Sequence, residues 1–420
     1  MFRKIIKTSW NLLTKIPRLK KALNRFYAWR IFEIVPVLKK ILYRFYDKFW
    51  YLELYIENNQ QNLSHYLKSN IEIENKRLKY ILPYQKNWNH NKEKNWEILE
   101  ILEKIEDSIQ FLFLKEHFLE EKNWKDIDFY NVITDQITSN SGTQEFSDIN
   151  HFMQTLNCLD NLHKKFELDK VRNKIKVAIG SSGEFILIEG ILFFSLLKIL
   201  EINPVPVKII YRHPQWKKIY NAFLKFKTIH GGIYQPLIHP DLNLEIYDSN
   251  SEKRFKIMRD NLDSNAGTLL DIGANLGFFC HKFEDIGFEC YAVEVRPSNV
   301  YFMTKLRDIE NKKFKIINKS IFDLKEPREY DIVIALNIFH HFLREQKLYS
   351  QLIEFLKNLR VSVMFFQPHD PLEDIMKNAY INFNNRQFVD FIIKNSCLNK
   401  SVLLNEKVDG KNRPIYKLIK

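Results

Sequence analysis

The chain has 420 residues, of which 45% are hydrophobic and 27% are charged. This composition excludes a disordered chain and a mini-fold held by disulfides or metals, and the length suffices for about two to four domains. The four cysteines show no CxxC spacing, no cleavable signal peptide is found, and no apolar run is long enough to cross a membrane, so we expect a cytoplasmic protein.

The net charge of +13 is concentrated in residues 1–50, which hold 13 Lys and Arg but only two acidic residues. Apolar residues recur there at helical spacing, and Pro17 and Pro36 divide the pattern. We therefore predict a basic amphipathic arm. Such an arm packs on its own protein, binds an acidic partner, or lies peripherally on an anionic membrane, here at its inner face. Nucleic acid stays open as a less favoured partner.

Residues 51–148 are predicted to be a helical region, because residues 51–135 contain no glycine and are rich in Glu, Lys, Leu and Ile. Its clearest helix is expected near Trp96–Glu121, where apolar residues recur at helical spacing. The polar, turn-prone stretch Thr138–Asp148 indicates a boundary.

Residues 149–230 are predicted to form a small α+β domain. Lys176–Ile179 and Phe185–Ile188 indicate a hairpin around Gly-Ser-Ser-Gly, followed by an apolar helix over Leu192–Leu200 and a strand over Pro206–Tyr211. The order GEFILIEG, apolar helix, PVPVKIIYRHPQW resembles the ParB-like (sulfiredoxin-like) domain. Because Gly190 is followed by apolar residues instead of that family's phosphate-gripping ones, we expect a degenerate copy with a structural or substrate-presenting role.

Residues 231–254 are expected to link the two halves of the chain. The stretch GGIYQPLIHPDL carries Tyr234, Gln235 and His239, which is more aromatic and imidazole character than a linker needs. It either lines an acceptor pocket or is a solvated connection.

Residues 255–420 alternate between strands and helices, which predicts a mainly parallel sheet with its ligand crevice at the carboxyl ends of the strands. The final two strands are expected to form a hairpin around Asp409-Gly410, with the last strand antiparallel. The expected strands are Thr268–Ile272, Cys290–Glu294, Phe314–Asn318, Asp331–Leu336, Val361–Phe366, Val402–Leu404 and Arg413–Leu418. The expected helices are Phe278–Ile286, Asn299–Asp308 and Glu345–Leu359.

A glycine-rich loop follows the first of these strands, in a chain with only 11 glycines. Its sequence, LLDIGANLGFF, lacks the glycines of a dinucleotide fingerprint and the GK[ST] of a P-loop. It resembles the acidic-x-Gly-x-x-x-Gly loop of class I S-adenosylmethionine-dependent methyltransferases. The resemblance implies a Rossmann-like seven-stranded α/β fold, S-adenosyl-L-methionine as cofactor and methyl transfer (EC 2.1.1.-), with Asp271, Gly273, Asn275 and Gly277 at the cofactor.

The following strand ends supply the other cofactor residues that the resemblance implies. Glu294 closes the second strand, where a carboxylate accepts the ribose hydroxyls. Ser320 and Ile321 follow the third strand and are expected at the adenine through backbone groups. Asn337 follows the fourth strand, facing the sulfonium and the acceptor.

Histidines after the fourth and fifth strands are the candidate catalytic residues. His340, His341 and His369 are suited to removing a hydroxyl proton, and helix packing or capping is the alternative role. We expect no metal, because a third ligand at regular spacing is missing. The unidentified methyl acceptor is expected to be a small molecule or a glycan precursor. The alternatives are a non-catalytic S-adenosylmethionine-binding module and an RNA methyltransferase that uses the basic arm.

Overall fold

The computed structural model describes residues 68–81, 103–138, 146, 148–244, 246, 250–324, 329–408 and 413–420. The basic arm predicted for residues 1–50 and the turn at Asp409-Gly410 lie outside these residues. Among the helices of the described part, none has the length and apolar character to cross a membrane.

The first sheet is a mixed, six-stranded one with the strand order β1-β6-β4-β5-β2-β3. Strands β4 and β5 form the predicted antiparallel hairpin, and β4 pairs in parallel with β6. The strands are β1 (Asn70–Ile73), β2 (Leu78–Ile81), β3 (Glu103–Lys104), β4 (Lys176–Ile179), β5 (Phe185–Glu189) and β6 (Val205–Arg212).

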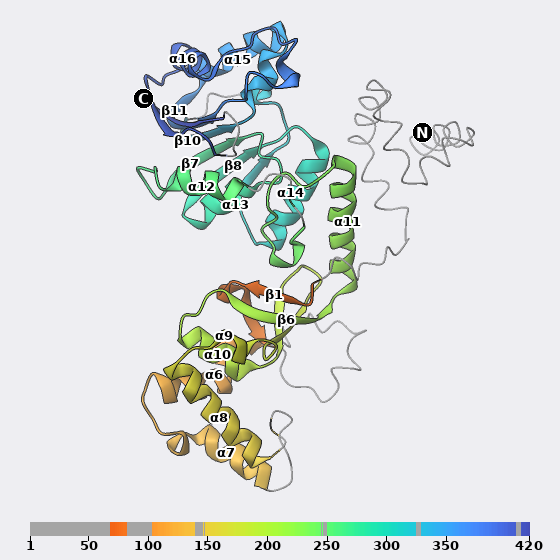
Figure 1. Cartoon of the computed structure of the whole chain (residues 1–420), viewed down its shortest axis with the longest axis vertical. Coiled ribbons are helices and arrows are strands. Elements are labelled where there is room, and N and C mark those ends of the chain that lie inside the picture. Colours follow the sequence, from red (N-terminus) through yellow and green to blue (C-terminus); the bar gives the residue numbers. More distant parts are fainter. Residues whose placement is uncertain are drawn as a thin grey trace, which may run out of the picture. The chain divides into compact units, whose positions relative to one another are not determined.

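The helices α6 to α11 belong to the same stretch of the chain as this sheet. The buried apolar helix α10 contacts α6 and α8, and the long helix α11 follows β6 (Figure 1). The helices are α6 (Ile109–Phe118), α7 (Asp128–Thr138), α8 (Ile149–Lys164), α9 (Leu168–Val171), α10 (Ile191–Ile199) and α11 (Pro214–His230). The predicted hairpin, helix and strand of residues 176–212 are thus confirmed, whereas the ParB-like resemblance stays a prediction.

The prediction that residues 51–148 are simply helical is wrong. This region contributes β1, β2 and β3 to the sheet. Of the helix expected over Trp96–Glu121, residues 96–102 lie outside the described residues, residues 103–108 are not α-helical, and α6 begins at Ile109. Glu103–Lys104 pairs with Tyr80 and Ile81 instead. The helix starts late because the Ser108 side chain accepts a hydrogen bond from the Phe111 amide at 3.3 Å and so caps it.

The second sheet has seven strands in the order β12-β13-β11-β10-β7-β8-β9. The five strands β7 to β11 pair in parallel, and β13 is antiparallel to both β11 and β12, as predicted. The strands are β7 (Gly267–Ile272), β8 (Phe288–Val293), β9 (Lys315–Ile317), β10 (Glu329–Leu336), β11 (Arg360–Gln367), β12 (Lys400–Asn405) and β13 (Ile415–Ile419). The predicted Rossmann-like seven-stranded α/β fold is confirmed.

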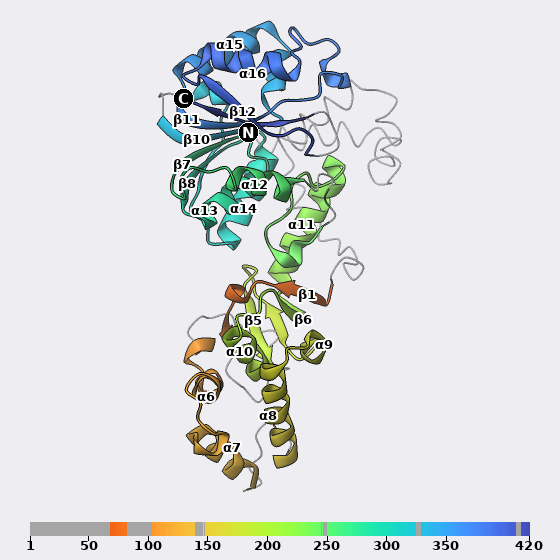
Figure 2. The ribbon, with the colours of Figure 1, turned by 60° about the vertical axis from the view of Figure 1, so that its left-hand side comes forward.

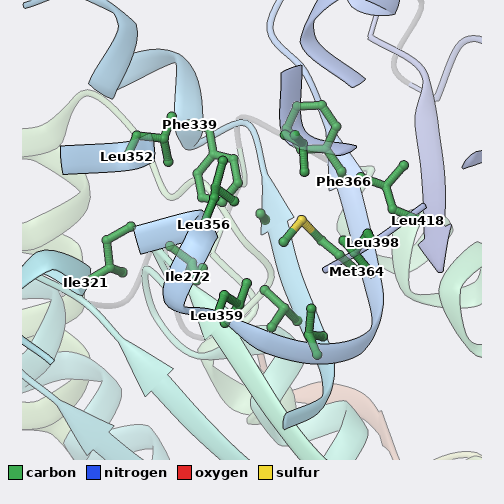
Figure 3. Close-up of a cluster of buried hydrophobic side chains, with 14 of the residues drawn as sticks. Ile272, Ile321, Phe339, Leu352, Leu356, Leu359, Met364, Phe366, Leu398 and Leu418 are labelled. Carbon is green, nitrogen blue, oxygen red and sulfur yellow. The ribbon is translucent and has the colours of Figure 1, made fainter. Parts of the chain in front are cut away.

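Successive residues of the central strands bury opposite faces of this sheet. Leu270 and Ile272 join a core with α15 and α16, whereas Leu269 joins one with α12, α13 and α14. Figure 2 shows the two helix layers, and Figure 3 shows the first core. The helices are α12 (Ser251–Arg259), α13 (Phe278–Asp285), α14 (Pro297–Ile309), α15 (Gln346–Asn358) and α16 (Asn385–Asn395). Because both faces are covered, side chains at the strand ends form the accessible edge.

Short 3₁₀ helices occupy several connections in the described ranges. They are η2 (Asn75–Arg77), η4 (Ile105–Asp107), η5 (Trp124–Asp126), η6 (Pro240–Leu242), η7 (Ile321–Asp323), η8 (Phe339–Leu343) and η9 (Asp374–Met376).

Candidate functional site

The order of the second sheet reverses at its centre. From β7 the chain continues to β8 and β9 on one side, and then crosses to β10 and β11 on the other. In open α/β sheets, ligands bind outside the carboxyl ends of the strands at this reversal. The ends of β7 and β10 and the loops after them are therefore the place to look for a site. Asp271 lies next to the last residue of β7, and Gly273 and Asn337 lie in the loops.

The loop after β7 depends on glycine at two positions. Gly273 and Gly277 have φ angles of +75° and +82°, in the left-handed region that side chains other than glycine rarely adopt. A Cβ on Gly273 would lie 2.8 Å from Cδ1 of Ile338. The amides of Gly273 and Ala274 both donate to the Val293 carbonyl, at 2.9 and 3.0 Å. The loop thus folds tightly over the end of β8.

Glu294 is held in place at the end of β8. Its Oε2 accepts a hydrogen bond from the Asn275 amide at 3.0 Å, and its Oε1 accepts one from the Val295 amide at 2.8 Å. Glu294 and Asn275, two predicted cofactor residues, are directly joined.

Asp271 is a buried carboxylate with an unsatisfied oxygen. The residue is 3% exposed, and its Oδ2 has no hydrogen-bond partner within the described part of the chain. Burial, and secondarily the charge of Glu294, raise the pKa of Asp271 to about 7. Such a shift marks a site where a cationic or hydrogen-donating ligand would stabilise the carboxylate.

One cavity joins Asp271 and Gly273 to residues from outside the glycine loop. Gln235 and Arg254, which are 4% and 2% exposed, line it together with Asn337. The other lining residues are Tyr234, Ile272, Phe279 and Leu336.

The predicted linker over residues 231–254 includes the connection from α11 to α12, and part of it lies in the wall of this cavity. The solvated alternative is wrong, because Ile233, Gln235 and Leu242 are buried and Tyr234 and Gln235 line the cavity. His239 is not among the lining residues of this cavity. Sequence reasoning missed Arg254. The available signal was its position four residues before the buried Met258, which places it on the inner face of α12.

Asn337 lies on the other side of the reversal, immediately after β10. Its φ angle is +51°, and its Nδ2 donates to Oε1 of Gln367 at 3.0 Å. Gln367 in turn donates from Nε2 to the Arg413 carbonyl at 2.9 Å. This chain of bonds orients the Asn337 amide, whose Oδ1 has no partner among the described residues.

The three candidate catalytic histidines form a cluster at the ends of β10 and β11. The ring centroid of His340 lies 4.0 Å from that of His341 and 5.3 Å from that of His369. His340 is buried and His341 is exposed. Burial lowers the pKa of His340 to about 2 and also lowers the pKa of His369.

A hydrogen-bond chain orients His369. Its Nε2 lies 3.1 Å from Oδ1 of Asn382, and Asn382 donates from Nδ2 to the Pro371 carbonyl at 2.9 Å. Because the Asn382 oxygen only accepts, Nε2 of a neutral His369 carries the proton and Nδ1 carries the lone pair. That Nδ1 is buried and has no partner in the described ranges.

The two residues predicted at the adenine have local roles. The hydroxyl of Ser320 accepts from the Phe322 amide at 3.3 Å and caps η7, and Ile321 belongs to the core on the α15 side. Neither side chain is among the lining residues of the cavity. Their backbone groups remain the predicted contact.

Metal-ligating residue types are not gathered anywhere in the described part. No group of three or more His, Cys, Asp or Glu side chains there is placed to hold a metal ion.

Comparison with known proteins shows what the seven-stranded part of the chain is similar to. Residues 270–360, which run from within β7 to the start of β11, match the model of the methyltransferase domain family. This stretch of the chain is thus similar to a methyltransferase domain. No curated protein sequence matches the chain.

Solved structures also resemble parts of this chain. Monomeric WbdD is 18% identical, with 45% of this chain and 46% of WbdD covered and a TM-score of 0.37. The match thus spans less than half of WbdD. The N-methyltransferase NodS from Bradyrhizobium japonicum WM9 is 10% identical, with 41% and 98% covered and a TM-score of 0.34. The PH0226 protein from Pyrococcus horikoshii OT3 is 13% identical, with 41% and 92% covered and a TM-score of 0.34.

Proposed function

We propose that this protein is a methyltransferase that binds S-adenosyl-L-methionine at the carboxyl ends of β7, β8 and β10. The observation that carries the proposal is a set of buried acceptor atoms, around one cavity and its loop, that have no hydrogen-bond partner among the described residues. An unsatisfied buried acceptor costs about 1–3 kcal/mol, so several at one strand edge indicate a donor-rich ligand. The atoms are Gln235 Oε1, Asp271 Oδ2, Asn275 Oδ1 and Asn337 Oδ1.

The residues fit the chemical groups of this cofactor. Its ammonium group and ribose hydroxyls are hydrogen-bond donors, and Asp271 and Glu294 supply carboxylate oxygens that accept. Arg254 is a buried cation on the cavity wall, and we assign it to the carboxylate of the amino-acid tail. When bound, the cofactor would supply an electrophilic methyl group on a sulfonium.

Calorimetry with S-adenosylmethionine and S-adenosylhomocysteine tests this proposal. We expect both to bind, and Glu294→Ala to weaken binding by about 1–3 kcal/mol, because the ribose hydroxyls lose their acceptor. Glu289→Ala is a matched control, because Glu289 lies on the same strand in an exposed ion pair with Lys315. Absence of binding to both compounds would refute the proposal.

We assign His369 as the base for a hydroxyl acceptor, because Asn382 fixes its tautomer. Its Nδ1 accepts the proton while the cavity residues position the reactants, which is where most of the rate acceleration of a displacement arises. His369→Gln should reduce transfer by about 10²–10⁴-fold for such an acceptor. Asn382→Asp should raise the pKa of His369 and move the acidic limb of the rate profile to higher pH.

Transfer of a labelled methyl group into a lysate from cells lacking the protein measures this activity. His341→Gln is the matched control, because its ring is exposed and we expect transfer to persist. If His369→Gln transfers at the parent rate, His369 is not the base, while the methyltransferase assignment stands. We propose a small molecule or a glycan precursor as the acceptor, and the labelled product identifies it.

We also propose that the basic arm predicted for residues 1–50 binds anionic membranes. Each exposed Lys or Arg contributes about 1 kcal/mol near an anionic surface, and the apolar positions add burial. Replacing Ile5, Leu12 and Ile16 with Ser should release the full chain from anionic vesicles. Binding that is unchanged by these replacements would contradict the proposal.

A further inference from the structure

The segment Ile233–Leu242 connects α11 to the cofactor cavity and is anchored by buried polar contacts. Asp241, which is 6% exposed, accepts from Nε and Nη2 of Arg212 on β6, with its closest contact at 2.6 Å. Its Oδ2 also accepts from Nε1 of Trp216 at 2.7 Å. Three donor atoms therefore fix one end of the segment.

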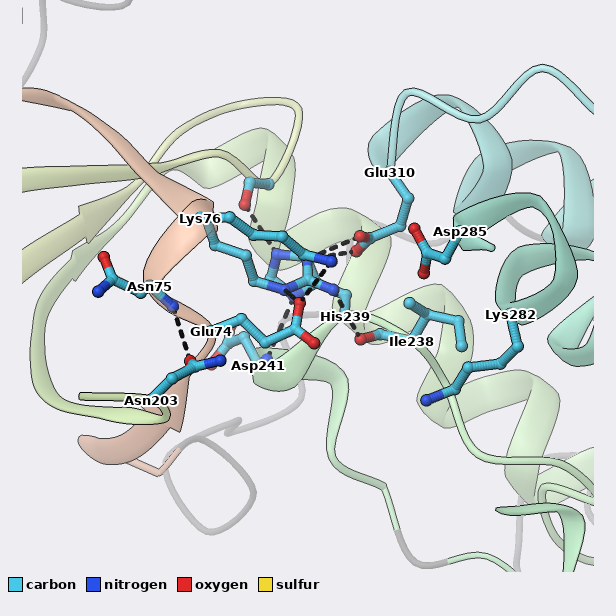
Figure 4. A network of polar contacts seen from close by, with 12 residues as sticks. Glu74, Asn75, Lys76, Asn203, Ile238, His239, Asp241, Lys282, Asp285 and Glu310 are labelled. Carbon is cyan, nitrogen blue, oxygen red and sulfur yellow. Dashed lines mark hydrogen bonds and ion pairs between the residues drawn. The ribbon is translucent and has the colours of Figure 1, made fainter. Parts of the chain in front are cut away.

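Two further contacts hold the same end. Nε2 of His239 donates to the Gly183 carbonyl at 2.7 Å, and its Nδ1 accepts from the Asp241 amide at 3.2 Å. Burial lowers the pKa of His239 to about 4, so the ring is neutral and supplies one donor and one acceptor. Arg77 donates to the Ile238 carbonyl at 3.3 Å, and Figure 4 shows Ile238, His239 and Asp241 in this network.

The other end of the segment reaches the cavity. Tyr234 and Gln235 line it beside Asp271 and Arg254, and Oε1 of Gln235 is buried without a hydrogen-bond partner among the described residues. Pro236 and Pro240 lie between the two ends, and each fixes its own φ angle. Four residues separate Gln235 from Pro240, and Pro236 is one of them. Because the two prolines stiffen this short segment, we expect a displacement of Asp241 to displace Gln235 as well.

We propose that Arg212 and Asp241 are positioning residues that hold Gln235 at the cavity, so that the six-stranded domain sets the affinity of the methyltransferase domain for its cofactor. This inference rests on the proposed function, since it assigns Gln235 Oε1 to a donor of the cofactor. The family model begins at residue 270, so all three residues lie outside the matched part.

A double-mutant cycle on the full chain, with S-adenosylhomocysteine as the probe in calorimetry, tests the proposal. Gln235→Ala should weaken binding about tenfold, and Arg212→Lys about fivefold, because lysine keeps the charge and loses the paired contact to Asp241. In the Gln235→Ala background, Arg212→Lys should change the affinity by less than about twofold.

Pro240→Ala provides a second perturbation that leaves the buried ion pair intact. It should weaken binding about twofold to threefold in the parent and not in the Gln235→Ala background. Asp260→Asn, which breaks an exposed ion pair with Lys256, is the control and should leave binding unchanged.

The possible outcomes separate this inference from the proposed function. If the parent chain binds and the effects of Arg212→Lys and Gln235→Ala multiply, or if neither Arg212→Lys nor Pro240→Ala weakens binding, the positioning role is wrong while the cofactor site stands. If the parent chain does not bind the probe, the proposed function fails, and this inference fails with it.

Discussion

The two sheets of this protein each have a buried aspartate beside them, and the two carboxylates differ in how they are satisfied. Asp241, next to the six-stranded sheet, accepts from Arg212 and Trp216. Asp271, in the seven-stranded sheet, has an oxygen without a partner in the described part and a pKa raised to about 7. A buried charge whose partners lie within the fold needs no ligand, whereas one without partners indicates a ligand site.

The largest expected effect is a difference in the free energy of unfolding between variants of the two aspartates. Asp241→Asn removes the counter-charge of a buried Arg212, and breaking such a pair lowers the free energy of unfolding by about 3–5 kcal/mol. Asp271→Asn removes an unsatisfied charge and should not lower it. Urea unfolding of both variants near pH 7.5 measures the difference. Equal destabilisation by the two substitutions would contradict the view that Asp241 has a structural role and Asp271 a ligand-binding one.

A pH dependence of similar size should belong to Asp271. Its folded-state pKa of about 7 lies above the unfolded value of about 3.9, so the folded chain keeps a proton that the unfolded chain loses. The contribution is fully present below about pH 4 and falls as pH rises through 7, by about 4 kcal/mol in total.

Comparison of the parent with Asp271→Asn isolates this contribution from the buried histidines, whose lowered pKa values act in the opposite direction at acidic pH. The variant should gain stability relative to the parent between pH 5 and 7.5. A constant difference between the two proteins over this range would contradict the assignment.

Two glycines with φ angles in the left-handed region are expected to show a smaller difference in stability when each is replaced by alanine. A Cβ on Gly190, which caps α10, would lie 2.2 Å from the Lys174 carbonyl oxygen, whereas one on Gly273 would meet a flexible Ile338 side chain. Gly190→Ala should cost about 3 kcal/mol of stability and Gly273→Ala about 1–2 kcal/mol. Thermal unfolding ranks them, and only Gly273→Ala should also weaken cofactor binding.

The seven-stranded sheet and the core of its site were predictable from the sequence because their signals are local. Asp271 and Glu294 end apolar strands, and Gly273 and Gly277 stand within one loop, so neighbouring residues define each feature. Parallel pairing then brings the strand ends to one edge.

The six-stranded sheet was only partly predictable, because its pairing joins distant segments. Asn70 on β1 pairs with Lys208 on β6, and no local pattern encodes such a contact. The composition of residues 51–148 favoured helix, and tertiary pairing overrode it. The roles of Arg254 and Asn382 were not predicted from the sequence for a related reason, since these roles arise from residues that the fold brings beside them.

A crystal structure of the full chain with S-adenosylhomocysteine tests the central claim most directly. We predict that the ligand lies at the edge of β7, β8 and β10, that it contacts Asp271 and Glu294, and that it supplies partners for Gln235 Oε1 and Asn337 Oδ1. A ligand bound elsewhere on the molecule, with these acceptors still unpaired, would contradict the account.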